Sequence, residues 1–118
     1  MMSTTHPINW KQCLSNCNQK ESLAHEILAL FATDLKQLKN DILNAHQSNN
    51  KDDLQHYVHK LHGACAYCCA TSLEQQAGTL EMALASKSSQ HYSSLVQSIV
   101  KEIEDLIVVL QKKDYVTF

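Results

Sequence analysis

Apolar residues recur at intervals of three and four along almost the whole chain, which is the period of an amphipathic helix. Short polar segments interrupt the pattern, among them "QSNNKDD" at 47–53 and "SKSSQ" at 86–90. The pattern predicts a short first helix with Asn9 as its N-cap, then four longer helices, the last but one capped by Thr71 or Ser72. We therefore predict an all-α protein, an antiparallel up-down four-helix bundle with a short additional N-terminal helix.

Each predicted helix presents one apolar stripe to the core of the bundle. The stripes are Trp10, Leu14 and Cys17; Leu23, Ile27, Leu30, Phe31, Leu35, Leu38, Ile42 and Ala45; Leu54, Val58, Leu61, Cys65 and Cys68; Leu73, Ala77, Leu80 and Leu84; and Leu95, Ile99, Ile103, Leu106 and Leu110. Because the bundle uses all of these stripes, we expect the isolated domain to be a monomer.

The composition suits a single domain spanning residues 1–118, with its core at about residues 8–112. Hydrophobic residues make up 44% of the chain and charged residues 19%, which is enough to build a core. A net charge of −2 argues against nucleic-acid binding driven by positive charge. No apolar run approaches the roughly 20 residues of a membrane span, so we expect no direct insertion into a membrane. Five cysteines without a disulfide-scaffold spacing favour a reducing cytoplasm.

The segment "HYVHKLHGACAYCC" at 56–69 concentrates side chains that bind metals or act as nucleophiles. His56, His59, His62, Cys65 and Cys68 recur at every third position. At about 100° per residue this ladder winds about 240° around a helix, so its members cannot converge on one ion. A metal site that uses the three histidines and a cysteine stays open as an alternative function. Cys65 and Cys68 lie on the apolar stripe and are interpreted as structural.

His59 lies on the helix face opposite the core, and small residues follow it on that face. Gln55 precedes it by one turn, Gly63 follows by one turn, and Ala66 and Ala70 continue the strip. Glycine inside a helix costs about 1 kcal/mol relative to alanine. Here it would let another protein approach the imidazole closely. The alternative is a solvated face with an incidental histidine and glycine.

The stretch "HKLHGACAYC" at 59–68 resembles the signature of histidine phosphotransfer (HPt) domains, H-x-apolar-K/H-G followed by small residues. With Trp10 in the first helix and the "LE" at Leu80–Glu81, the chain is most similar to the C-terminal HPt domain of BarA/GacS-type tripartite hybrid sensor kinases. The resemblance covers roughly Ile8 to Leu110. Cys69 departs from it, since relatives often have glycine there, and this puts the local form of the helix end in doubt.

The resemblance implies that His59 carries a phosphoryl group and exchanges it with aspartates in the receiver domains of a hybrid kinase and a response regulator. Gly63 would give the receiver access. Mg²⁺ would lie in the partner receiver, with no cofactor in this domain. The chain would then be cytoplasmic, either by itself or as the cytoplasmic C-terminal part of an inner-membrane sensor kinase.

Glu81 is the candidate acceptor for the second ring nitrogen of His59, because a fixed Nδ1–H sets the tautomer and the ring orientation. Lys60 and His62 flank His59 and could neutralise the charge of an incoming phosphoryl group. All three could instead be ordinary surface residues.

No P-loop or kinase glycine-rich loop is present, and the two glycines of the chain could not build one. The expected activity is therefore that of a phosphocarrier and not of an enzyme. A third interpretation is a helical adaptor that is not phosphorylated, in which His59 would be dispensable.

Overall fold

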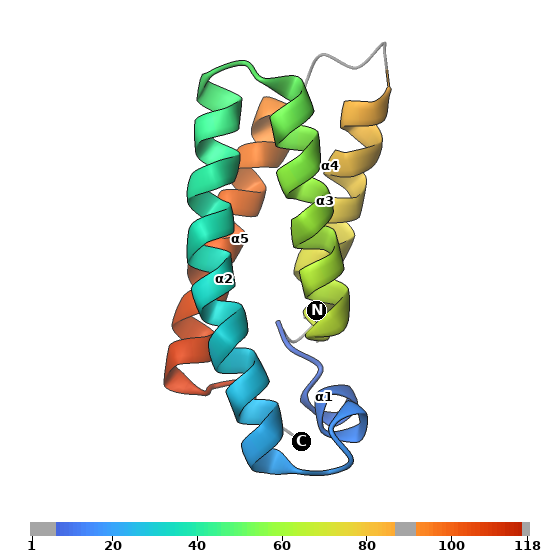
Figure 1. Cartoon of the computed structure of the whole chain (residues 1–118), viewed down its shortest axis with the longest axis vertical. Coiled ribbons are helices and arrows are strands. Elements are labelled where there is room, and N and C mark those ends of the chain that lie inside the picture. Colours follow the sequence, from blue (N-terminus) through green and yellow to red (C-terminus); the bar gives the residue numbers. More distant parts are fainter. Residues whose placement is uncertain (1–6, 87–91, 117–118) are drawn as a thin grey trace, which may run out of the picture.

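The computed structural model describes residues 7–86 and 92–116, which form five α-helices. The helices are α1 (Trp10–Asn16), α2 (Glu21–Gln47), α3 (Lys51–Tyr67), α4 (Thr71–Ala85) and α5 (Ser93–Lys112). Helices α2 to α5 stand side by side and alternate in direction, and α1 lies across the end at which α3 stops and α4 starts (Figure 1). The predicted all-α bundle is confirmed.

The four long helices form a ring in which α2 contacts α3 and α5, and α4 contacts α3 and α5. Two hydrogen bonds of Asn9 fix the start of the short helix α1. The Gln12 N–H donates to the Asn9 side chain at 3.1 Å, so the predicted N-cap is confirmed. The Asn9 N–H donates to the Cys69 carbonyl at 2.8 Å, which ties the start of α1 to the junction of α3 and α4.

The predicted stripes of α3 and α4 are buried along their whole length. Their residues are Leu54, Val58, Leu61, Cys65, Cys68, Leu73, Ala77, Leu80 and Leu84. In each of these helices a single row of apolar side chains has the helical period, so the sequence leaves little choice of buried face.

The predicted stripe of α2 is wrong near its N-terminus. Leu23 and Leu30 are exposed, and the core seam there lies one position along, at Ala24 and Leu28; from Phe31, which is buried as predicted, the seam follows the predicted stripe. The two candidate seams differ by only about 100° around the helix, and alanine gives a weak apolar signal. The same one-residue shift leaves Leu14 and Leu95 only partly buried, beside the buried Cys13 and Val96.

The turn between α3 and α4 is a Schellman motif. The Ala70 N–H donates to the Cys65 carbonyl at 2.9 Å, and the Cys69 N–H donates to the Ala66 carbonyl at 3.4 Å. Cys69 has φ 61°, the left-handed conformation that usually takes glycine. The residue that caps α4 is Ala70, and Thr71 already belongs to the helix, so the prediction of Thr71 or Ser72 as the cap is wrong.

The other predicted turns are described in part. Asn50 caps α3, because its side chain accepts from the Asp53 N–H at 3.1 Å. Ser86 ends α4, and the rest of the predicted 86–90 turn lies outside the described residues.

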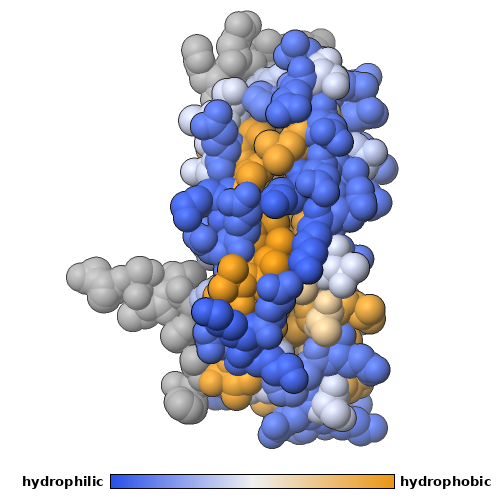
Figure 2. All heavy atoms as spheres, turned by 90° about the vertical axis from the view of Figure 1, so that its left-hand side faces the viewer, coloured by the Kyte–Doolittle hydropathy of each residue, from blue (hydrophilic) through white to orange (hydrophobic). Residues whose placement is uncertain are grey.

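The face on the side where α2 and α5 lie is mainly hydrophilic, and a narrow apolar stripe runs along it between rows of hydrophilic side chains (Figure 2). Among the described residues, no helix combines the length and the apolarity needed to cross a bilayer.

Candidate functional site

His59 projects from the middle of α3, and the inner edge of its ring faces a carboxylate on α4. Its side chain is 75% exposed, and its Nδ1 lies 2.5 Å from Oε2 of Glu81, whose side chain is 26% exposed. The carboxylate accepts the Nδ1–H and so favours the tautomer whose lone pair is on Nε2. Within the described residues Nε2 has no hydrogen-bond partner, so this nitrogen is available to an incoming electrophile.

Glu81 reaches His59 because the short α3–α4 turn places the two helices in close contact. One flank of the buried Ala77–Leu80–Leu84 stripe thereby faces α3, and Glu81 lies on that flank. The hydrogen bond expected between His59 and Glu81 is present in the structure.

The same carboxylate binds a second histidine, which the sequence did not indicate. Oε1 of Glu81 accepts from Nδ1 of His62 at 2.8 Å, and Nε2 of His62 lies 3.9 Å from a Glu74 oxygen. Sequence reasoning assigned His62 to the incoming phosphoryl group, whereas both of its ring nitrogens face acids of α4. The sequence does contain two histidines one turn apart and two glutamates on the next helix. That pattern does not determine which glutamate each histidine binds.

The hydrogen bond from His59 holds the pKa of Glu81 below its usual range. Partial burial acts in the opposite direction, and the hydrogen bond from His62 and the charges of both rings lower the pKa further. Glu81 is therefore ionised at neutral pH and can balance positive charge on either imidazole.

The surface beside His59 is open. A Cβ added to Gly63 would meet no atom within 4 Å, and Ala66 is exposed one turn further along. Gln55 is half-buried one turn before His59. We call Gln55, His59, Gly63 and Ala66 the docking face.

Two of the other predicted residues lie elsewhere. Lys60 is exposed on the α2 side of α3, where it lines a hollow with Asp34 and Asp41, away from the acids of α4. Ala70 is fully buried, so its prediction as a docking residue is wrong. The reason is that α3 ends at Tyr67, and helical spacing no longer places residue 70 on the face of His59.

The five cysteines are buried free thiols: Cys13, Cys17, Cys65, Cys68 and Cys69. Burial is the main cause that raises the pKa of Cys13 to about 11 and that of Cys68 to about 12. Cys65 and Cys68 thus lie in the core as predicted. Within residues 7–86 and 92–116, no group of three or more His, Cys, Asp or Glu side chains is arranged to hold a metal ion.

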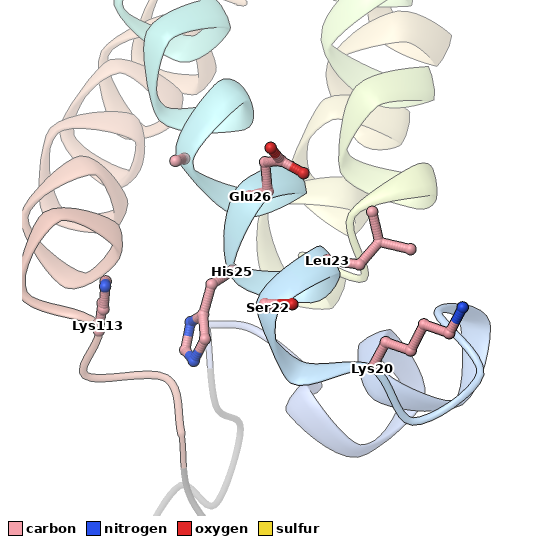
Figure 3. Close-up of a pocket in the computed structure, with 7 residues that line it drawn as sticks. Lys20, Ser22, Leu23, His25, Glu26 and Lys113 are labelled. Atoms are coloured by element: carbon pink, nitrogen blue, oxygen red, sulfur yellow. The ribbon is translucent and has the colours of Figure 1, made fainter.

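A second hollow lies at the N-terminal end of α2 and is lined by His25, Lys20 and Lys113 among others. Its polar side chains diverge: Lys20 projects away from His25 and Lys113 (Figure 3). His25 is already engaged, since its Nδ1 lies 2.5 Å from the Tyr115 hydroxyl and its ring packs on Trp10. This hollow therefore does not gather its polar groups around one ligand.

Comparison with known proteins identifies the family. The family model of the Hpt domain matches residues 26–112. The chain belongs to the Hpt domain family. Its structure is similar to the crystal structure of the HPt domain from a sensor hybrid histidine kinase from Shewanella, with a TM-score of 0.80 and 25% identity over 91% of this chain and 92% of that one. No curated protein gives a significant match.

Membership of the HPt family confirms the resemblance drawn from "HKLHGACAYC" and identifies the chain as a phosphotransfer module of two-component signalling. The narrower similarity to BarA/GacS-type kinases stays a prediction.

Proposed function

We propose that this HPt domain carries a phosphoryl group on Nε2 of His59 and exchanges it with aspartates of receiver domains. The observation that carries the proposal is the geometry of His59, whose Nδ1 is 2.5 Å from the Glu81 carboxylate while the ring is 75% exposed. The carboxylate fixes the tautomer, and the exposed edge presents the nucleophilic nitrogen.

The transfer step needs no group from this chain beyond the imidazole and its carboxylate. The Nε2 lone pair of His59 forms the N–P bond as the P–O bond of the receiver's aspartyl phosphate breaks, and the electron pair leaves with the aspartate carboxylate. The ring then bears a positive charge, with its Nδ1–H donated to Glu81. Because the carboxylate stabilises that charge, it lowers the barrier in both directions.

The docking face allows the receiver to come close. Gly63 has only backbone at the surface one turn from His59, so a partner meets no side chain there. Lys60 lies on the other flank of His59, where its charge can attract an anionic receiver surface. The Mg²⁺ and the acidic pocket that hold the phosphoryl group before transfer belong to the receiver.

In this role the chain is a phosphocarrier between the receiver domain of a hybrid sensor kinase and that of a response regulator. It acts in the cytoplasm, as a monomer, either alone or as the cytoplasmic C-terminal part of an inner-membrane kinase of the BarA/GacS type. Phosphate flow in either direction uses the same His59–Glu81 pair.

The test is incubation with a receiver domain that has been phosphorylated in the presence of Mg²⁺. We expect an acid-labile, base-stable phosphoryl group that peptide mapping places on His59. His59→Gln should abolish acceptance, whereas His56→Gln, on the same helix and also exposed, should accept at the wild-type rate. Acceptance by His59→Gln together with its loss in His62→Gln would place the nucleophile at His62 and overturn the assignment.

A further inference from the structure

His59 and His62 lie on successive turns of α3 and divide one carboxylate between them. The two oxygens of Glu81 have different partners: Oε2 lies 2.5 Å from Nδ1 of His59, and Oε1 lies 2.8 Å from Nδ1 of His62. A glutamate side chain has three rotatable bonds and can orient its carboxylate in many ways. With one oxygen held by His62, the other is held in the direction of His59.

The ring of His62 packs against α4, not alongside the outward edge of His59. A Cβ added to Gly78 would lie 3.6 Å from Nε2 of His62 and 3.7 Å from its Cε1, so the ring lies over bare backbone. Its Nε2 lies 3.9 Å from Glu74. The side chain is 38% exposed, half of the value for His59. With both nitrogens directed at α4, the ring is poorly placed to meet a phosphoryl group on Nε2 of His59.

We propose that His62 is a positioning residue, which acts on His59 through Glu81. This inference rests on the proposed function and adds to it a residue whose effect requires the shared carboxylate. His62 donates to Oε1, so Oε2 stays directed at the Nδ1–H of His59, and the proton of His59 stays on Nδ1. Nε2 then keeps its lone pair for the phosphoryl group.

Three variants separate this role from a direct contact with phosphate. His62→Phe keeps a ring of similar size but removes the donor. His62→Asn places its amide nitrogen close to the position of the original Nδ1 and so restores the donor. His56→Phe is the matched control, because His56 lies one turn before His59 on the same helix, is exposed, and packs edge-on against Tyr57.

The first readout is the transfer rate from a phosphorylated receiver, measured alone and in a Glu81→Ala background. We expect His62→Phe to slow transfer about three- to tenfold, the effect of one lost hydrogen bond to a charged group at a partly exposed site. His62→Asn should recover most of that loss. In the Glu81→Ala background His62→Phe should cause no further slowing, because the two changes remove the same interaction.

The second readout is the tautomer of His59, from the ¹⁵N shifts of its ring nitrogens near pH 8. We expect the Nδ1–H form to dominate in wild type and His62→Asn, and to decrease in His62→Phe and Glu81→Ala. Equal slowing by His62→Phe with and without Glu81, or a His59 tautomer that is unchanged in His62→Phe, would overturn the proposal. A wild-type protein that accepts no phosphate would overturn the proposed function instead, and the tautomer measurement would still test the positioning.

Discussion

Helix α3 carries two kinds of nucleophilic side chain, and the bundle places them in opposite environments. His59 is exposed on the docking face, whereas Cys65, six residues later, is fully buried in the core. Six residues correspond to about 600°, so the two side chains point to different sides of the helix. Their spacing in the sequence decides which one a partner can reach.

The acids of α4 widen this difference. Glu81 accepts from His59, and in the proposed function it stabilises the positive charge that phosphorylation creates on the imidazole. Burial is the largest cause that raises the pKa of the Cys65 thiol. The neighbouring Cys68 is the second cause, and the negative charge of Glu74 is the third. Burial is thus the main cause that suppresses the Cys65 thiolate and Glu74 adds a smaller effect, while Glu81 on the same helix favours a charged imidazole.

The strongest way to break the comparison is to close the docking face. Gly63→Leu should reduce transfer from a phosphorylated receiver more than about 100-fold, because its side chain would occupy the space that a partner must enter. The fold should tolerate the change, since a Cβ at Gly63 meets nothing within 4 Å. Stability should rise by about 0.5–1 kcal/mol, as measured by urea denaturation, because glycine disfavours helices.

Gly63→Ala is the matched control for this experiment, since it gains helix propensity with only one methyl group. We expect it to transfer at a rate close to that of wild type. Full transfer by a well-folded Gly63→Leu variant would show that the receiver does not dock over this glycine.

The second test concerns the buried thiols, which are Cys65 in the C-terminal half of α3 and the other cysteines near it. At pH 7.5 the thiols should react with iodoacetamide at least about 100-fold more slowly in the folded protein than in urea. Burial and a pKa of about 11 for Cys13 or about 12 for Cys68 leave very little thiolate at that pH. Mass spectrometry of the alkylated protein gives the rate at each site. Rapid labelling of Cys65 without unfolding would contradict its place in the core.

The third test removes the acid and leaves the imidazole. Glu81→Ala should slow acceptance about tenfold or more without changing the residue that is phosphorylated, because a hydrogen bond to a charged group is worth about 1.5–3 kcal/mol. Glu81→Gln keeps an acceptor oxygen but lacks the charge, so its transfer rate should lie between that of wild type and that of Glu81→Ala. An unchanged rate in Glu81→Ala would mean that the carboxylate has no part in transfer.

The sequence predicted the buried faces and the site best where a single physical constraint determined the position of a side chain. The stripes of α3 and α4 follow from helical period, and the pairing of His59 with Glu81 follows from the need of an imidazole for an acceptor together with the family resemblance. The period does not predict the exposure of Leu23, because the neighbouring seam that begins at Ala24 has the same period and alanine is a weak apolar signal. Ala70 was misplaced because the pattern did not show that α3 ends at Tyr67.

The place of His62 could not be predicted for a different reason. Its contact with Glu81 depends on how α4 is rotated about its axis against α3, and that angle follows from packing over the whole interface. Period gives the face of each residue on its own helix, but it does not give the pairing of two polar flanks across a helix interface.

The smallest expected effect is the contribution of the shared carboxylate to stability at low pH. The pKa of Glu81 is lowered in the folded state, first of all by the hydrogen bond from His59, so the unfolded chain binds this proton more readily. The resulting stabilisation is present above the ordinary glutamate pKa of about 4.3 and is lost as the pH falls through the lower folded value. Urea denaturation of wild type and Glu81→Gln from pH 7 to pH 3 isolates it. We expect a difference of at most about 1 kcal/mol at pH 6, since the pair is partly exposed, and a progressive decrease of that difference below pH 4.3. A difference that stays constant down to pH 3 would mean that Glu81 gains nothing from the two histidines as an ion, and the contrast between the two halves of α3 would then rest on burial alone.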